Sequence, residues 1–340
     1  MRILYGVVGE GMGHATRSKV VIRHLLARGH TVLIASAGRA ADFLSHAGFN
    51  VVKAQELGID YTDGAVNSAG TLALNLGRLP GILATGGAAW VKFDTFAPQL
   101  VISDFDSLAS MYGRTHGIPV ISIDNMQAID RCAHAPEITA SPDFEITRAI
   151  VAARLPGCAH YVITSFFYPP IAKPNTTLVP PILRDAVLQA RVTNDGPVLV
   201  YQTSMGDARL LETLSQFPSR QFVVYGTTGR ALANVMMKAF DEQGFVDDLA
   251  RSSAVIANGG MSLLGEALSL GKPVYSVPVR GQFEQEMNAR YVEALGLGMM
   301  SREFNADTLR RFLGGLGGFG RIVRSDNGRL FQTVDSLLAG

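Results

Sequence analysis

The feature of this 340-residue chain that most constrains its fold is an alternation of strand-like and helix-like segments. Short apolar runs recur in the first half, and each leads through loop residues into a helix-like stretch. The predicted strands of this half cover residues 3–8, 31–36, 51–54, 100–103, 120–123 and 161–164. Such alternation is typical of parallel sheets built from βαβ units, so it predicts an α/β fold.

The alternation stops in the middle of the chain and then restarts. Residues 176–197 contain a Pro pair and an Asn-Asp-Gly-Pro turn sequence without a strong period, which indicates a domain boundary. After it, strand-like runs cover residues 197–204, 221–226, 234–240, 254–260 and 273–278. We therefore expect two Rossmann-like domains, 1–182 and 183–340, that face each other across a cleft, with the last helix packing back on the first domain.

Composition excludes several classes of protein. The net charge of +1 provides no general attraction for nucleic acid, and two cysteines give neither a disulfide framework nor a metal site. No apolar run reaches the roughly 18 residues of a transmembrane helix, so we expect a cytoplasmic protein. The apolar segment 78–93 is most simply a helix packed on the first sheet, but an acceptor-binding or membrane-facing surface is the alternative. The apolar stretch 72–90 permits a lipid-linked acceptor without requiring one.

A glycine-rich loop follows the first predicted strand. Gly9 and Gly11 have the spacing of a dinucleotide-binding G-x-G-x-x-G loop, but His14 occupies the position of the third glycine. The second strand also ends without the acidic residue that binds a ribose, so we disfavour a dinucleotide cofactor and expect none. We interpret the loop as placing His14 at a helix N-terminus, where the dipole keeps the imidazole neutral and able to act as a general base. A histidine that only caps or packs the helix is the alternative.

Asp104 and Asp106 follow the apolar run 100–103 and are the candidate partners of His14. A carboxylate beside an imidazole fixes its tautomer and stabilises its charged form. Asp104 is nearer to the strand end and is the preferred partner; Asp106, or helix capping by either residue, is the alternative. The Asp-Phe-Asp triplet is only weak as a metal signal, because no third ligand accompanies it at metal spacing.

The most informative passage of the second half contains a second glycine turn. The predicted strand ends at Asn258, two glycines follow, and a helix begins at about Met261. The free N–H groups and the dipole of that helix form a site for a diphosphate, to which the Ser262 hydroxyl adds a donor. Glu266, about one helical turn further on, can accept both hydroxyls of a ribose. Glu284 and Gln285 suit sugar hydroxyls, so together these residues predict a nucleotide-sugar site.

The C-terminal half resembles the donor domain of inverting GT-B glycosyltransferases, which include UDP-glucuronosyltransferases, plant UDP-sugar transferases and the bacterial peptidoglycan N-acetylglucosaminyltransferase. The matching elements are "NGG" before a helix, an E-x-x-x-x-G-x-P sequence from Glu266 to Pro273, and "EQEMNA". "GEGMGHATRS" is similar to the family's first loop, whose histidine deprotonates the acceptor. Plant-type members carry a histidine at the position of Asn258, and their second phosphate loop has a double glycine that "YQTSMGD" lacks.

The resemblance implies a GT-B fold and a role for each matching residue. It implies His14 as the base, Asp104 as its partner, and an acceptor-side loop with Gly11 and Gly13. For the donor, it implies uracil recognition by Phe240, the ribose at Glu266 and the transferred sugar at Glu284 and Gln285. The implied phosphate-binding residues are Thr203, Ser204, Gly259, Gly260, Met261 and Ser262.

From these residues we expect a metal-independent, inverting hexosyltransferase. It would move a sugar from a UDP-sugar to the hydroxyl of a small or lipid-linked acceptor, without a divalent ion because the helix N-terminus stabilises the leaving diphosphate. Two alternatives share the nucleotide site. They are a UDP-N-acetylglucosamine 2-epimerase-like isomerase and a non-catalytic nucleotide-sugar-binding protein.

Overall fold

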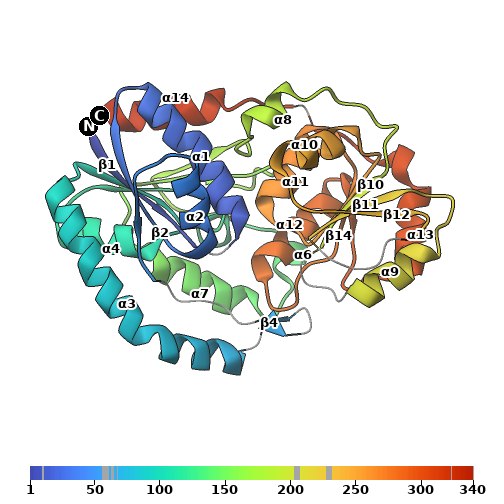
Figure 1. Cartoon of the computed structure of the whole chain (residues 1–340), viewed down its shortest axis with the longest axis horizontal. Helices are drawn as coiled ribbons and strands as arrows, with labels where there is room; N and C mark the ends of the chain where they lie inside the picture. The colour runs from blue at the N-terminus through green and yellow to red at the C-terminus, as the bar shows by residue number, and fades with distance from the viewer. Residues whose placement is uncertain are drawn as a thin grey trace.

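The computed structural model contains two parallel-sheet α/β domains that lie next to each other (Figure 1). It describes the chain except residues 10, 56–60, 63–64, 67, 203–206, 227–231, 323 and 340, and it describes only the backbone of 61–62, 65–66, 68–80, 83 and 207. The predicted fold class, with a parallel sheet in each half, is confirmed.

The first sheet has seven parallel strands in the order β3-β2-β1-β6-β7-β8-β9. Its strands are β1 (Arg2–Val7), β2 (Thr31–Ser36), β3 (Val51–Lys53), β6 (Leu100–Asp104), β7 (Val120–Asp124), β8 (His160–Thr164) and β9 (Thr176–Val179). Two short antiparallel strands, β4 (Tyr61–Thr62) and β5 (Ala65–Val66), form a separate pair.

The second sheet has six parallel strands in the order β12-β11-β10-β13-β14-β15. Its strands are β10 (Val198–Tyr201), β11 (Phe222–Tyr225), β12 (Val235–Lys238), β13 (Val255–Ala257), β14 (Val274–Ser276) and β15 (Gly298–Met300). In both sheets the strand order reverses direction once, between β1 and β6 and between β10 and β13.

Helices connect the strands and cover both sheets (Figure 1). Those between β1 and β8 are α1 (Met12–Ala27), α2 (Gly38–His46), α3 (Ser68–Phe96), α4 (Ser107–Thr115), α5 (Ala128–Arg131), α6 (Pro136–Thr139) and α7 (Phe144–Arg154). The remainder are α8 (Asp185–Gln189), α9 (Asp207–Ser215), α10 (Glu242–Arg251), α11 (Met261–Ser269), α12 (Phe283–Ala294), α13 (Ala306–Gly314), the 3₁₀ helix Leu316–Gly318 and α14 (Gly328–Ala339).

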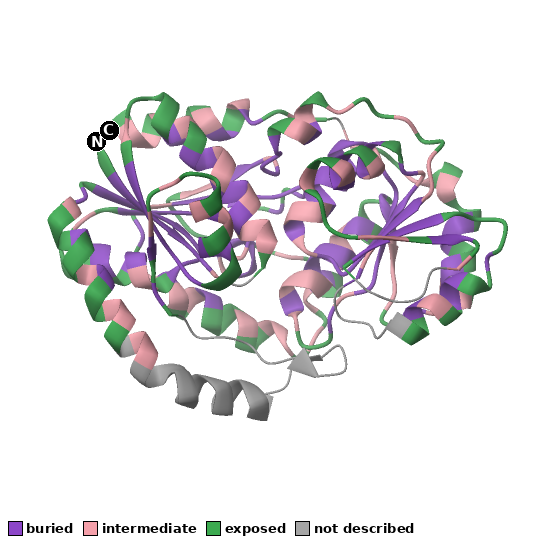
Figure 2. Ribbon diagram, in the orientation of Figure 1, coloured by how far each residue is buried: buried purple, intermediate pink, exposed green. Residues whose placement is uncertain are grey.

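The strands of both sheets are continuous apolar runs because both faces of each sheet are buried. Five of the six residues of β1 are buried, as are all residues of β6, β7 and β13, because helices cover both faces of a parallel sheet (Figure 2). One hydrophobic cluster includes Phe167 of the first domain and Met287 of the second. The Phe167 ring also stacks on Tyr291 at 3.8 Å, so the two domains share part of their core.

Four strands of the structure were not predicted from the sequence. The segment expected to form turns from residue 176 begins with β9, which forms the edge of the first sheet, and neither β15 nor the β4–β5 pair was predicted.

The last helix, α14, packs on the first domain: Leu330 and Val334 share a cluster with Ile3, and Asp335 contacts His24 at 2.8 Å (Figure 1). The chain therefore ends against the domain in which it begins.

The C-terminal part of α3 packs on the first domain. Ala89 and Phe93 are buried in the shared core, and the Trp90 ring meets the Tyr112 ring edge to face at 5.6 Å. Most side chains of the apolar stretch 72–90 lie outside the described residues, so an acceptor surface there stays a prediction. Within the described part of the chain, no helix has the length and apolarity to span a membrane.

Candidate active site

The predicted site loops lie where parallel α/β sheets usually bind their ligands. The loop that leads into α1 follows β1, and Asp104 ends β6, the neighbouring strand on the other side of the reversal. The 258–260 turn follows β13, which adjoins β10 at the equivalent reversal of the second sheet. Ligands of such sheets bind outside the carboxyl ends of the strands at these reversals.

His14 and Asp104 form a hydrogen-bonded pair. Nδ1 of His14, in the first turn of α1, lies 2.8 Å from Oδ1 of Asp104. The Asp104 carboxylate is buried, but 21% of the His14 side chain is exposed, so the ring can reach a substrate. Burial lowers the pKa of His14, and the nearby Arg17 guanidinium lowers it further against the opposing effect of Asp104. The imidazole is therefore neutral near pH 7, as a general base requires.

A buried arginine holds the Asp104 carboxylate. Arg17 donates from Nε to Oδ2 at 2.8 Å and from Nη2 to Oδ1, and the Ser18 hydroxyl also donates to Oδ2 at 2.8 Å. Burial alone would raise the pKa of Asp104, but Arg17 and His14 hold it well below its usual range. Asp104 is therefore an anion at every pH at which the protein would work.

The turn after β6 separates the two candidate carboxylates. Phe105 has a φ of 56°, a left-handed conformation that is unfavourable for a bulky residue, and Arg154 donates from Nε to its carbonyl oxygen at 2.9 Å. Asp106 then caps α4, since its Oδ1 accepts from the Ala109 N–H at 2.7 Å. Asp104, the preferred candidate, is thus the carboxylate that contacts His14.

The second glycine turn places the N-terminus of α11 against the His14 loop. Gly259 has a φ of 110°, which L-residues rarely adopt, and Gly260 precedes the helix without a side-chain cap. Ser262 Oγ donates to the Gly13 carbonyl at 3.1 Å, and a Cβ on Gly13 would lie 2.8 Å from that hydroxyl oxygen. A glycine at position 13 therefore permits the two helix N-termini to approach each other.

Glu284 connects the two domains. It lies in the first turn of α12, and its Oε1 accepts from Asn125 Nδ2 of the first domain at 2.9 Å and from Asn288 Nδ2 at 2.6 Å. The backbone N–H of Met261 also donates to this carboxylate, and burial raises the pKa of Glu284. The residue expected to bind the transferred sugar is thus held at the seam between the sheets.

Glu266 is also near the seam, but an arginine occupies its carboxylate. Arg184 donates from Nε to Oε1 at 2.6 Å and from Nη2 to Oε2 at 2.7 Å, and both side chains are buried. Arg184 also lies 3.5 Å from Glu242, which in turn lies 3.6 Å from Lys19 of α1. A ribose at Glu266 would have to share this carboxylate with the guanidinium.

The other predicted donor-binding residues make no contact with the His14–Asp104 pair among the interactions that the structure describes. Gln285 uses its side chain within its own loop, with Oε1 accepting from the Val279 N–H at 3.1 Å and Nε2 donating to Gln282. Phe240 follows β12, and its ring is 52% exposed, as a base-stacking platform must be. Thr203 and Ser204 lie outside the described residues.

Three residues of this network were not predicted from the sequence: Arg17, Asn125 and Arg184. Arg17 is three residues after His14 on a helix, so it shares a face with the base. Asn125 directly follows a buried strand at the same sheet edge as Asp104, which was a usable signal. Arg184 lies in the segment read as turns, and only the tertiary structure brings it to Glu266.

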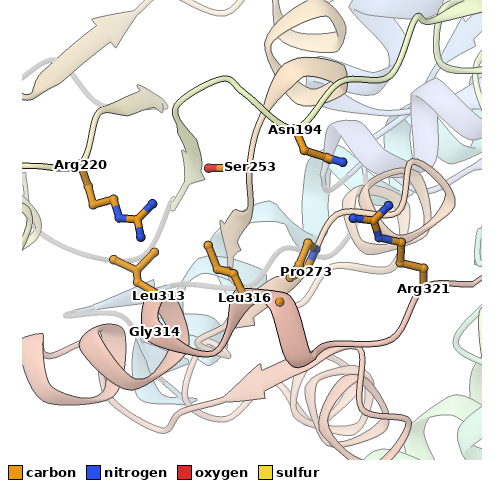
Figure 3. A pocket seen from close by; sticks show the side chains of 9 residues that line it. Asn194, Arg220, Ser253, Pro273, Leu313, Gly314, Leu316 and Arg321 are labelled. Atoms are coloured by element: carbon orange, nitrogen blue, oxygen red, sulfur yellow. The ribbon is translucent and has the colours of Figure 1, made fainter.

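A cavity of about 440 Å³ lies away from this network (Figure 3). Asn194, Arg220, Ser253 and Pro273 line it, and each precedes a strand of the second sheet. It therefore opens at the amino ends of these strands, opposite the turn before α11. Among the residues that the structure describes, no three His, Cys, Asp or Glu side chains gather as metal ligands.

Two parallel-sheet α/β domains that lie next to each other are the architecture of GT-B glycosyltransferases. The chain belongs to glycosyl transferase family 1, whose profile matches residues 1–317. It is 25% identical over 339 residues to an uncharacterized glycosyltransferase of Methanosarcina acetivorans, covering 88% of this chain and 85% of the relative. A glycosyltransferase of Methanosarcina mazei is 24% identical over 326 residues, with the same coverage.

Solved structures agree with the fold. The calicheamicin glycosyltransferase CalG4 superposes with a TM-score of 0.66 at 17% identity, covering all of this chain and 98% of that one. The Streptomyces sp. SF2575 glycosyltransferase SsfS6, complexed with thymidine diphosphate, gives a TM-score of 0.61 at 19% identity and covers 99% of each chain. The GT-B fold expected from the sequence is therefore confirmed.

Proposed function

We propose that this glycosyltransferase moves a hexose from a nucleoside diphosphate sugar to an acceptor hydroxyl, with inversion at the anomeric carbon. The observation that carries the proposal is the contact between the two loops. His14, which pairs with Asp104 in the first domain, directly follows Gly13, whose carbonyl accepts from Ser262 at the N-terminus of α11 in the second domain. A base and a diphosphate site would thus face the same reacting atoms.

His14 acts as the base in this mechanism. Its Nδ1 faces Asp104, so Nε2 is the nitrogen that removes the acceptor proton as the hydroxyl oxygen attacks the anomeric carbon. Asp104 keeps the ring oriented and stabilises the imidazolium that forms. Attack from the face opposite the leaving diphosphate inverts the configuration.

The second domain holds the donor in this mechanism. The amides of Gly259 to Ser262, at the positive end of α11, stabilise the charge that builds on the leaving diphosphate, so no divalent ion is required. Phe240 stacks on the base, with Glu266 at the ribose and Glu284 at the sugar. Gln285 supports the sugar-binding loop, and Thr203 and Ser204 supply a second phosphate loop.

UDP is our choice of nucleotide because of the family resemblance, and the thymidine diphosphate bound to SsfS6 supports a pyrimidine nucleotide in general. We place the acceptor on the first domain, with a lipid-linked acceptor as one candidate for the apolar stretch 72–90. The domain boundary falls at residues 182–183, between β9 and β10. Cytoplasmic location, with or without a membrane contact, is part of the same proposal.

Replacement of His14 tests this mechanism. His14→Ala should bind the donor with nearly unchanged affinity and lose about 10²-fold or more in turnover, because general-base catalysis contributes that much. His46→Ala, at the exposed C-terminus of α2, is the matched control and should keep wild-type turnover. Nucleotide release is the measurement, and wild-type turnover in His14→Ala contradicts the assignment.

A further inference from the structure

Arg17 is a buried cation to which the proposed mechanism gives no role. It lies one turn after His14 on α1, and only 5% of the residue is exposed. A guanidinium is costly to bury unless its donors are satisfied, and this one is surrounded by acceptors. It donates to the Asp104 carboxylate and to Oδ1 of Asn125, and its Nη2 lies 2.8 Å from Nδ1 of His14. The site therefore holds a fixed positive charge beside its base.

We propose that Arg17 is a positioning residue for the general base. It holds the Asp104 carboxylate against Nδ1 of His14, and its charge keeps the imidazole neutral until the acceptor proton arrives. The proposal rests on the proposed role of His14 as the base. It assigns to Arg17 an effect on protonation that packing alone would not produce.

The geometry of the carboxylate selects the tautomer of His14. Oδ2 of Asp104 accepts from Arg17 Nε and from Ser18 Oγ, each at 2.8 Å. Oδ1 accepts from Arg17 Nη2, which also lies 2.8 Å from Nδ1 of His14. Asp104 is ionised, so its carboxylate can only accept, and Nδ1 of His14, 2.8 Å from Oδ1, donates a hydrogen to that oxygen. Nε2 is then the unprotonated nitrogen, which is what the base needs.

The charges that act on His14 come from three elements. Arg17 lies on α1, Asp104 ends β6, and Arg154 ends α7 and adds a second, weaker positive influence. Behind Arg17, Asp124 at the end of β7 and Glu284 of α12 favour its charged form. Without the guanidinium, the imidazole would face a buried carboxylate with little positive charge nearby. The charged form of His14 would then be favoured, and its pKa would rise.

Contacts from both domains fix the position of Arg17. Its Nη1 donates to Asn125 Oδ1, and the Asn125 amide donates in turn to Glu284 of the second domain at 2.9 Å. The planar fork of an arginine can serve Asp104 and Asn125 at once, whereas a lysine ammonium supplies one point charge. The residue beside the base is thereby connected to the residue proposed to bind the donor sugar.

The test follows the ring nitrogens of His14 by ¹⁵N NMR of the substrate-free protein, with the His14 signals assigned by their loss in His14→Gln. In the wild type, we expect a neutral Nδ1–H tautomer at pH 7. In Arg17→Gln, which removes the charge but can still donate to Asp104, the pKa of His14 should rise by about one pH unit or more. Arg17→Lys is the charge-retaining control and should give less than half of that shift.

Several results would overturn the proposal. One is an Nε2–H tautomer or an imidazolium in the wild type at pH 7. Another is a His14 pKa in Arg17→Gln that matches the wild-type pKa or falls below it. If Arg17→Gln does not fold, the wild-type tautomer and charge decide alone. Because the readout needs no substrate, it separates this proposal from that of the base, which the turnover of His14→Ala tests. In active protein, the acid limb of kcat/KM should move upward with the pKa.

Discussion

At the scale of single residues, the turn at Phe105 determines which carboxylate contacts His14. Its left-handed conformation leaves Asp104 at the end of β6 facing His14 and turns Asp106 back to cap α4. Arg154 stabilises the turn twice, through the Phe105 carbonyl and by placing its guanidinium 4.6 Å from the centre of the Phe105 ring. Two aspartates of the same sequence triplet thus have different environments and different roles.

This difference predicts opposite outcomes for two isosteric substitutions. Asp104→Asn should lower turnover by about 10²-fold or more, because an amide cannot stabilise the imidazolium that forms on His14. Asp106→Asn should keep near wild-type turnover and stability, because asparagine caps helices as well as aspartate does. Steady-state kinetics on variants with wild-type circular dichroism are the measurement. Equal losses in the two variants would count against the assigned roles.

Asp124 makes the stability of the fold depend on pH. It is fully buried, and burial together with the nearby Asp104 charge raises its pKa to about 6. The unfolded chain ionises this carboxyl near its ordinary pKa of 3.8, so the folded state loses stability as the pH rises from about 4 to 6. Above about pH 6, the loss is complete and constant.

Asp124→Asn should therefore raise the free energy of unfolding by about 2 kcal/mol at pH 8 and change it little at pH 4. An amide keeps the local contacts, since Oδ1 still accepts from the Gln127 N–H and Nδ2 can donate to Ser122 Oγ. Urea unfolding at the two pH values measures the difference. A variant no more stable than the wild type at pH 8 would contradict the stated cause.

At the scale of elements, two helix N-termini define the site. Both α1 and α11 begin directly after a glycine, without a side-chain cap, and both follow a buried parallel strand. Their positive ends meet where Ser262 donates to the Gly13 carbonyl. Helix dipoles favour a neutral base at one end and a diphosphate at the other.

The two glycines before α11 should respond differently to a methyl group. Gly259→Ala should destabilise the protein by about 2 kcal/mol, because φ is 110° and the new Cβ would lie 2.7 Å from the Gln285 carbonyl oxygen. Gly260→Ala is the matched control: its Cβ would meet nothing within 4 Å, so stability should stay within about 1 kcal/mol. Chemical denaturation compares them, and an equally stable Gly259→Ala would refute the strain argument.

At the scale of the whole molecule, the sequence predicted the two sheets but not the side-chain contacts between the two domains. Alternating apolar runs predicted eleven strands and both sheets, because burial on two faces leaves a strong local pattern. β9 was missed because a Pro pair directly follows its four residues, and β15 because its three residues begin with a glycine. His14 and Asp104 could be predicted as site residues, because each lies at or beyond the carboxyl end of a buried parallel strand. No local sequence pattern predicts that Arg184 pairs with Glu266. Nor does one predict the hydrogen bond between Asn125 and Glu284, which are 159 residues apart in the sequence.

The central claim is that this enzyme holds a nucleoside diphosphate sugar at the N-terminus of α11. The most direct test is thermal unfolding of wild type and Gly260→Ala with UDP, GDP and dTDP sugars. Binding to the native state alone raises Tm, by the equivalent of about 2.7 kcal/mol at 100 times Kd. We predict a rise for the wild type with at least one of these donors, and loss of most of that rise in Gly260→Ala, whose methyl group would occupy the open space beside the helix N-terminus. No rise with any donor, or an equal rise in the variant, would contradict the account.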